Sequence, residues 1–316
     1  MKKISFAAVL AATTFGLGGY ALACSGCGCS LNTDDVTQGG GSGWHIDERF
    51  DYIDQNRLQI GGNRVGAQDP TTGTEVQKYT LSVFYTTTID YEAEGPWGIN
   101  LAIPVQYRIH STLNNSDWTP VKSNWNDLSD IRLIGRYTGL TDAKDIGLQF
   151  GMKFPTGRTT EAFTSGNSAQ IGNGVDRGLQ PGTGTWDALL GFYKNGQITE
   201  TLHWFTTAQW QKPLTEYNDF AEGQKLTGTI GVRYVFNQYL TPQLQVNVQN
   251  RWRDHGGQAD RANSGGEVIN LSPGLFVNIR EDTSIYGFIQ VPIYQRVGGL
   301  ELVPDYTASL GVKYKF

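Results

Sequence analysis

The chain has 316 residues, of which only 17% are charged, below the roughly 25% usual for soluble domains, whereas Gly (40), Tyr (15), Phe (14) and Trp (8) are abundant. This composition indicates a β-rich fold with many turns. The net charge of −5 argues against nucleic acid or another polyanion as a partner.

The first 23 residues have the pattern of a secretory signal peptide. Met1-Lys2-Lys3 is a short positive start, residues 4–22 are apolar or small, and Ala21-Leu22-Ala23 is a small-x-small cleavage site. No later apolar run approaches the about 20 residues that a membrane-spanning helix needs. We therefore expect residues 1–23 to be removed and the exported chain to begin at Cys24.

Residues 24–43 form a Cys- and Gly-rich segment, which we expect to lie in the periplasm ahead of the folded part. All three cysteines of the chain, Cys24, Cys27 and Cys29, stand in this segment. Attachment of a c-type haem needs a histidine directly after C-x-x-C. Gly28 stands there, so the motif excludes haem.

The cysteines leave three interpretations open. Three thiols are one ligand short of a closed tetrahedral zinc site, although they suit copper(I), and His45 or His203 could supply the missing ligand. A disulfide with one spare thiol is the second interpretation, because the periplasm is oxidising. The third is a lipid anchor on Cys24, against which Ala21 stands where lipoprotein signals usually carry Leu.

Strict alternation of apolar and polar residues marks the strands. In the run GINLAIPVQYRIH, which starts at Gly98, Ile99 and Leu101 fall on one face and Asn100 and Gln106 on the other. An even strand count suits a closed antiparallel up-and-down barrel in a membrane. The sequence therefore predicts an all-β transmembrane barrel over residues 44–316, with about twelve strands at 44–60, 76–91, 98–110, 128–140, 145–156, 185–194, 200–212, 224–237, 241–253, 266–280, 284–297 and 304–316.

The predicted connections alternate in length. Short turns such as EAEGP, TDAK, NGQ, NQYL and REDT separate long loops, which we expect at 61–74, 111–127, 156–184, 213–223, 254–265 and 298–303. Barrels of the bacterial outer membrane have short periplasmic turns and long extracellular loops. Because the chain starts and ends on the short-turn side, this pattern predicts that both termini are periplasmic.

The last predicted strand alternates from Tyr306 to a terminal aromatic, Phe316. This ending resembles the C-terminal signal by which bacterial outer-membrane barrels are recognised for assembly. We therefore expect the barrel assembly machinery to be a partner through Phe316, in addition to outer-membrane lipid around the wall.

If the aliphatic face of each strand meets lipid, the opposite face lines the lumen. Rings of fixed charge select the ions that enter a pore, so an Arg-lined lumen would favour anionic or polar aromatic solutes. The competing interpretation is that these side chains cross-link and plug a narrow barrel, with Lys153 and Asp187 as a structural pair. The predicted lumen residues are Arg49, Arg108, Arg132, Arg136, Lys153, Asp187, Arg233, Arg251, Arg253 and Arg296, together with Asp47, Asp51 and Asp130.

Four blocks of the sequence resemble a known family. They are FDYIDQNR (50–57), SDIRLIGRYTGL (129–140), GMKFPTGRT (151–159) and LQPGTGTWDALLG (179–191). These blocks are similar to those of the outer-membrane barrel family labelled for the meta-pathway of phenol degradation, and the cysteine-rich start resembles a subset of its members. The resemblance implies a barrel that moves small, often hydrophobic, molecules. None of the four blocks is a catalytic motif.

The sequence therefore predicts an outer-membrane pore or transporter for small aromatic, hydrophobic or anionic solutes, with no enzymatic activity. One alternative is a barrel scaffold for a metal or for electron transfer, using the cysteine cluster with copper or zinc. A less favoured alternative is an outer-membrane hydrolase. The chain has no G-x-S-x-G motif, and His110 and Ser111, being adjacent on a strand, would point to opposite faces.

Overall fold

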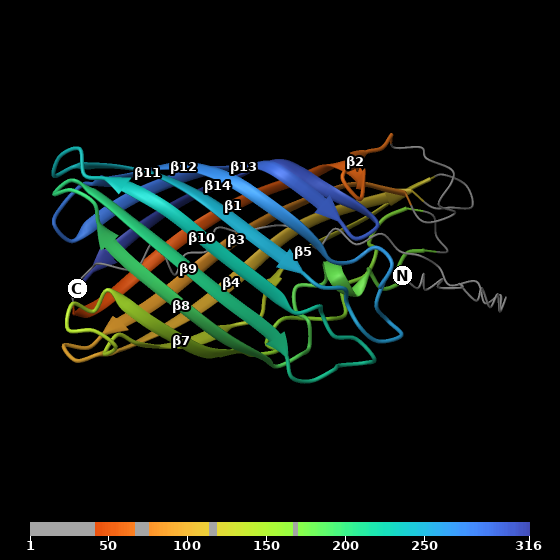
Figure 1. Cartoon of the computed structure of the whole chain (residues 1–316). Coiled ribbons are helices and arrows are strands. Elements are labelled where there is room, and N and C mark those ends of the chain that lie inside the picture. The colour runs from red at the N-terminus through yellow and green to blue at the C-terminus, as the bar shows by residue number, and fades with distance from the viewer. Residues whose placement is uncertain (1–41, 67–75, 114–118, 167–169) are drawn as a thin grey trace, which may run out of the picture.

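The computed structural model describes residues 42–66, 76–113, 119–166 and 170–316. These residues form one antiparallel sheet that closes on itself through the pairing of the last strand with the first, and twelve strands make up the barrel wall (Figure 1). The strands are β1 (Gly43–Ile60), β2 (Asn63–Arg64), β3 (Val76–Glu92), β4 (Trp97–Leu113), β5 (Pro120–Leu128), β6 (Arg132–Tyr137), β7 (Ile146–Lys153), β8 (Asp187–Gln197), β9 (Leu202–Pro213), β10 (Lys225–Tyr234), β11 (Leu240–Arg251), β12 (Gly266–Asn278), β13 (Thr283–Val297) and β14 (Leu300–Lys315). The predicted barrel is thus confirmed.

The two ends of the barrel differ in how the strands are connected. At one end, which we call the short-turn end, the connections are 93–96, 138–145, 198–201, 235–239 and 279–282. Both ends of the barrel sequence meet there, since the Phe316 N–H donates to the carbonyl of Trp44 at 2.9 Å. The opposite, long-loop end carries the segments 154–186, 214–224 and 252–265. Among the described residues, no helix is long and apolar enough to span a membrane.

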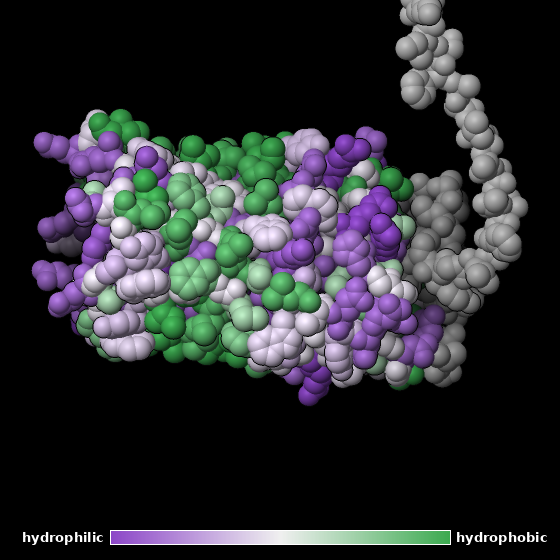
Figure 2. Space-filling view, turned by 60° about the horizontal axis from the view of Figure 1, so that its bottom comes forward, coloured by the Kyte–Doolittle hydropathy of each residue, from purple (hydrophilic) through white to green (hydrophobic). Residues whose placement is uncertain are grey.

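The outer face of the wall is apolar. Along β10, the side chains of Leu226 and Ile230 are exposed while Thr229 between them is buried, as expected for a strand with one face toward lipid. Figure 2 shows hydrophobic residues gathered over the central part of the barrel and hydrophilic residues toward both ends. An apolar surface this extensive is typical of a membrane protein and not of a soluble one.

Aromatic side chains fill part of the interior by lying over glycines of the neighbouring strand. A Cβ added to Gly311 would collide with the ring of Tyr286, and one added to Gly274 would collide with the ring of Phe288. These two buried rings pack with Phe276, with centroids 5.3 to 6.2 Å apart. The glycines therefore make room for large rings in the part of the interior nearer the short-turn end.

The structure corrects the predicted loop at 111–127, because β5 lies there and pairs with β4 from Val105 to Leu113. Its burial alternates, with Val121, Ser123 and Trp125 buried and the residues between them exposed. Together β5 and β6 act as one interrupted wall strand, where a single strand at 128–140 was predicted. The interruption lies opposite Pro104 of β4, which has no N–H to donate to the ladder.

The wall also changes where β13 meets β14. Their ladder runs from Thr283 and Tyr314 to Gln290 and Thr307. Beyond it, 291–297 of β13 pair with β12, whereas 300–304 of β14 pair with β1 and are buried on both faces. We call these two segments the seam. The predicted loop at 298–303 was therefore too long, since β14 begins at Leu300.

Candidate functional site

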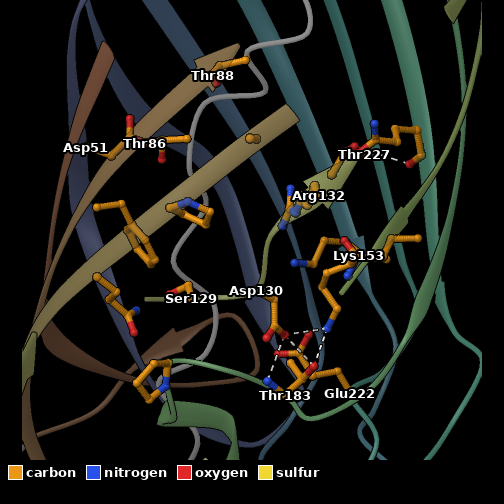
Figure 3. A pocket seen from close by; sticks show the side chains of 18 of the residues that line it. Asp51, Thr86, Thr88, Ser129, Asp130, Arg132, Lys153, Thr183, Glu222 and Thr227 are labelled. Carbon is orange, nitrogen blue, oxygen red and sulfur yellow. Dashed lines mark hydrogen bonds and ion pairs between the residues drawn. The ribbon is translucent and has the colours of Figure 1, made fainter. Parts of the chain in front are cut away.

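A cavity of about 240 Å³ lies inside the lumen (Figure 3). Residues of segments 154–186 and 214–224 line it, so it lies in the half nearer the long-loop end. Its walls come from strands on several sides of the barrel, namely β1, β3, β4, β6, β7, β9, β10 and β11. Gly178, Gln180, Pro181 and Thr183 of segment 154–186 also line it, as do Ser129, Asp130 and Glu222 from other connections. The cavity thus lies between the barrel wall and a part of segment 154–186.

Segment 154–186 reaches the cavity because its apolar side chains pack inside the barrel. Leu179 and Val175 are buried against Trp125 of β5. Arg108 of β4 holds the same turn, since its Nη1 donates to the carbonyl of Leu179 at 2.5 Å while its Nε donates to the Ser82 hydroxyl at 2.9 Å. The guanidinium of Arg108 is therefore used to fix the loop.

Asp130 joins the two ends of this inward segment. Its carboxylate accepts from the Gly157 N–H and from the Thr183 N–H, each at 3.0 Å, and from the Thr183 hydroxyl at 2.8 Å. Lys153 Nζ lies 3.0 Å from Asp130 and 3.1 Å from Asp187. Because these charged groups are buried and paired, the Lys153–Asp187 contact cross-links the lumen wall, as the plug interpretation expected.

Further buried ion pairs lie along the lumen wall, at the edge of the cavity and on its short-turn side. Arg49 Nε lies 2.9 Å from Asp51, and Arg136 Nη2 lies 2.8 Å from Asp90 and 2.6 Å from Glu92. In the same region the Tyr286 hydroxyl donates to Asp47 at 2.8 Å. We call this set the ionic layer, and its Arg49–Asp51 pair also lines the cavity.

The cavity itself carries more bases than acids. Arg49, Arg108, Arg132, Lys153 and Lys225 line it, against Asp51, Asp130 and Glu222. Sequence reasoning missed Lys225 and Glu222. Lys225 could have been predicted, because alternation along β10 places its side chain on the same inward face as those of Thr227 and Arg233. Glu222 could not, because it stands in a loop whose sequence has no alternation.

The other predicted lumen residues lie outside this cavity. Arg233 stacks over Phe205 with its guanidinium 4.6 Å from the ring centroid and donates to Gln243 at 2.6 Å. Arg251 is buried and lies 3.2 Å from Asp254. Arg253 and Arg296 are exposed, and Arg253 donates to the Gly298 carbonyl beyond the end of β11.

The proposed metal ligands are only partly within the described residues. Cys24, Cys27 and Cys29 lie outside them. His45 is buried on β1, with its Nδ1 3.8 Å from Asp90, and His203 lies on β9. Over the described ranges, no group of three or more His, Cys, Asp or Glu residues could hold a metal ion. A copper or zinc site therefore stays a prediction that rests on the cysteines.

Comparison with solved structures identifies the architecture. The COG4313 outer membrane channel from Pseudomonas putida F1 matches with a TM-score of 0.64 and 10% identity, covering 87% of this chain and 96% of that one. The translocator domain of the autotransporter NalP from Neisseria meningitidis matches with a TM-score of 0.50 and 12% identity, covering 90% and 92%. No protein-family model and no curated protein matches the sequence.

At these identities the similarity shows the fold alone. The class that the fold defines is the twelve-strand antiparallel β-barrel of the bacterial outer membrane. The resemblance of residues 50–57, 129–140, 151–159 and 179–191 to the phenol-degradation family stays a prediction, because no family model matches the chain.

Proposed function

We propose that this barrel is an outer-membrane channel that takes small solutes with an anionic group into the lumen cavity from the long-loop end. In this proposal both termini are periplasmic, so the long-loop end faces the outside of the cell. The observation that carries it is the excess of bases in the cavity, five against three acids. A narrow, low-dielectric passage concentrates the ions that its fixed charges favour.

Arg132 would contribute most to this preference. Arg49 and Lys153 are neutralised by direct ion pairs, and Arg108 is held by Ser82 and Leu179. Arg132 lines the cavity from β6 without a hydrogen bond or ion pair among the described residues. An unpaired guanidinium can offer its fork of donors to a carboxylate or phosphate.

Reversal potentials in a planar bilayer under a salt gradient test the proposal. Wild-type protein should prefer anions, and Arg132→Gln should lower the anion-to-cation permeability ratio by about two-fold or more, since one fixed charge acts over several ångströms with partial screening. Arg253→Gln is the matched control, because Arg253 is exposed outside the cavity. An unchanged ratio in Arg132→Gln, or cation preference in the wild type, would refute the anionic route.

The seam favours a second candidate function, which is lateral delivery of apolar compounds into the membrane. The two segments of the seam, 291–297 and 300–304, share no ladder, and side chains of β1 reach across to β13 instead. Gln59 Nε2 donates to the Gln295 carbonyl at 2.8 Å, and Arg57 Nη2 donates to the Gln295 side chain at 3.5 Å. Side-chain bonds of this kind separate more easily than a full ladder.

Labelling from the lipid phase would test the second candidate. With the native cysteines replaced by serine, Leu302→Cys, which is fully buried on β14, should react with a lipid-soluble maleimide if the seam opens. Leu310→Cys on the same strand is exposed to lipid and serves as the positive control. Labelling at Leu310→Cys without labelling at Leu302→Cys would exclude a lateral route through the seam.

A further inference from the structure

We propose that the lumen cavity binds a zwitterionic solute, with the anionic group of the solute on Arg132 and its amine on Glu222. The inference deepens the proposed function, on which it rests, by giving the solute a second and opposite charge. Amino acids and related amino carboxylates are the chemical class that fits. Figure 3 shows both side chains among those that line the cavity.

Glu222 reaches the lumen from the loop between β9 and β10, and the backbone on both sides of it is fixed. The Ala221 N–H donates to the His255 carbonyl at 3.0 Å. On the other side, the Gly223 N–H donates to Asp254 at 2.8 Å. A half-buried carboxylate is thus held at the cavity wall by hydrogen bonds of its neighbours, and its own oxygens have no hydrogen bond or ion pair within the described part of the chain.

The surroundings of Glu222 keep it ionised. Burial alone would raise the pKa of this carboxyl, but the positive charges of Lys225, Lys153, Arg251 and Arg132 together hold the pKa below its usual value. The group therefore presents a negative charge to the cavity at neutral pH. An amine of the solute would supply the hydrogen-bond donors that the carboxylate lacks.

Arg132 and Glu222 both line the cavity, and the positive charge of Arg132 helps to lower the pKa of Glu222, yet the two form no ion pair among the described residues. Space for a solute therefore remains between two open groups of opposite sign. A simple anion at Arg132 would also face the negative charge of Glu222, and a simple cation at Glu222 would face Arg132. A zwitterion satisfies both groups, so electrostatic complementarity selects it over either singly charged solute.

Uncharged polar side chains also line the cavity. Gln209, Gln211, Thr227 and Gln249 come from three adjacent strands, β9, β10 and β11. Their amides and hydroxyls both donate and accept, and they add no net charge that would favour one end of the solute. These side chains therefore leave the charge of the site to its bases and to Glu222.

Titration calorimetry on the refolded full chain in zwitterion-free detergent tests the inference with three probes of similar size, γ-aminobutyrate, butyrate and butylamine. Wild-type protein should bind γ-aminobutyrate about ten-fold more tightly than either of the others. Arg132→Gln should lower the affinity for γ-aminobutyrate about ten-fold. Glu222→Gln should lower that affinity by a similar factor and raise the affinity for butyrate, because the negative charge that repels butyrate is removed.

Arg253→Gln, which changes an exposed base outside the cavity, should leave all three affinities unchanged. Retained heat-modifiable migration on gels would show that each variant still folds as a barrel. Equal binding of butyrate and γ-aminobutyrate to the wild type, or no reversal of preference in Glu222→Gln, would overturn the inference.

Binding and conduction are separate readouts. An anion-selective conductance without γ-aminobutyrate binding would overturn the zwitterion site and leave the proposed channel standing. Binding with the expected variant pattern but without conductance would support the site and overturn the channel.

Discussion

Asp130 holds the inward segment to the barrel wall with a single carboxylate. It accepts from the N–H groups of Gly157 and Thr183 and lies 3.0 Å from Lys153 Nζ. Hydrogen bonds to charged groups contribute about 1.5–3 kcal/mol each, and a buried donor left without an acceptor is destabilising. The position of the segment, and hence the shape of the cavity, should therefore depend on this residue.

Asp130→Asn should release the segment while the barrel stays folded. Arg158 and Arg177 within the segment are trypsin sites, so cleavage there should become about ten-fold faster or more, as the free energy of local opening falls. Asp142→Asn, in an exposed short turn, is the matched control. Equal cleavage rates in the variant and the wild type would show that Asp130 does not hold the segment.

The pH dependence of solute binding should follow Glu222. The surrounding bases hold the pKa of this carboxyl below its ordinary value of 4.5, so it stays charged as the pH falls toward that value. Affinity for γ-aminobutyrate should therefore be constant from pH 8 to about pH 5.5, where the probe also remains zwitterionic. A calorimetric series that showed affinity falling between pH 7 and pH 6 would mean that another group controls binding.

Inward-facing bases on strands could be predicted from alternation alone, as Arg49, Arg132 and Arg136 illustrate, because parity along a strand fixes the face of a side chain. The hydrogen-bond and ion-pair partners of these bases could not be predicted in this way. Whether Arg132 meets a carboxylate depends on how segments 154–186 and 214–224 fold into the lumen, and loop sequences carry no periodic signal. Glu222 was missed for this reason.

At the scale of the elements, close packing of rings over glycines joins neighbouring strands. On β10, a Cβ at Gly231 would collide with the ring of Phe205, whereas a Cβ at Gly228 would be 3.7 Å from the nearest heavy atom. Gly231→Ala should therefore lower the free energy of unfolding by about 1–3 kcal/mol, as overpacking of a filled interior does.

Gly228→Ala on the same strand is the matched control and should change the free energy of unfolding little. Urea unfolding in lipid vesicles, followed by tryptophan fluorescence, gives the comparison. If Gly231→Ala and Gly228→Ala had the same unfolding midpoint, the interior around Phe205 would have to be loose and not packed.

Strand β5 shows which elements could have been predicted. Its alternation of Val121, Ser123 and Trp125 with Lys122 and Asn124 is a regular strand pattern, but its polar composition suggested a loop. The prediction missed the start of β14 for a different reason. Residues 300–304 are buried on both faces, so they do not alternate, and only the pairing with β1 shows that they form a strand.

At the scale of the molecule, the barrel has two unlike halves. The half nearer the long loops holds a charged cavity, whereas the half nearer the short turns carries buried ion pairs of the ionic layer and the packed rings of Phe276, Tyr286 and Phe288. A solute that leaves the cavity toward the short-turn end must therefore pass these charged and aromatic side chains. Slow, selective passage is expected from such a lumen, in contrast to the flow through a wide water-filled pore.

Single-channel current through a barrel labelled inside the cavity tests the lumen route most directly. With the native cysteines replaced by serine, Thr227→Cys in the cavity and Leu310→Cys on the lipid face are each treated with a negatively charged methanethiosulfonate reagent. A solute route through the lumen predicts discrete current steps that labelling reduces in Thr227→Cys and leaves unchanged in Leu310→Cys. Absence of current, or current that labelling at Thr227→Cys does not alter, would contradict a solute route through the lumen.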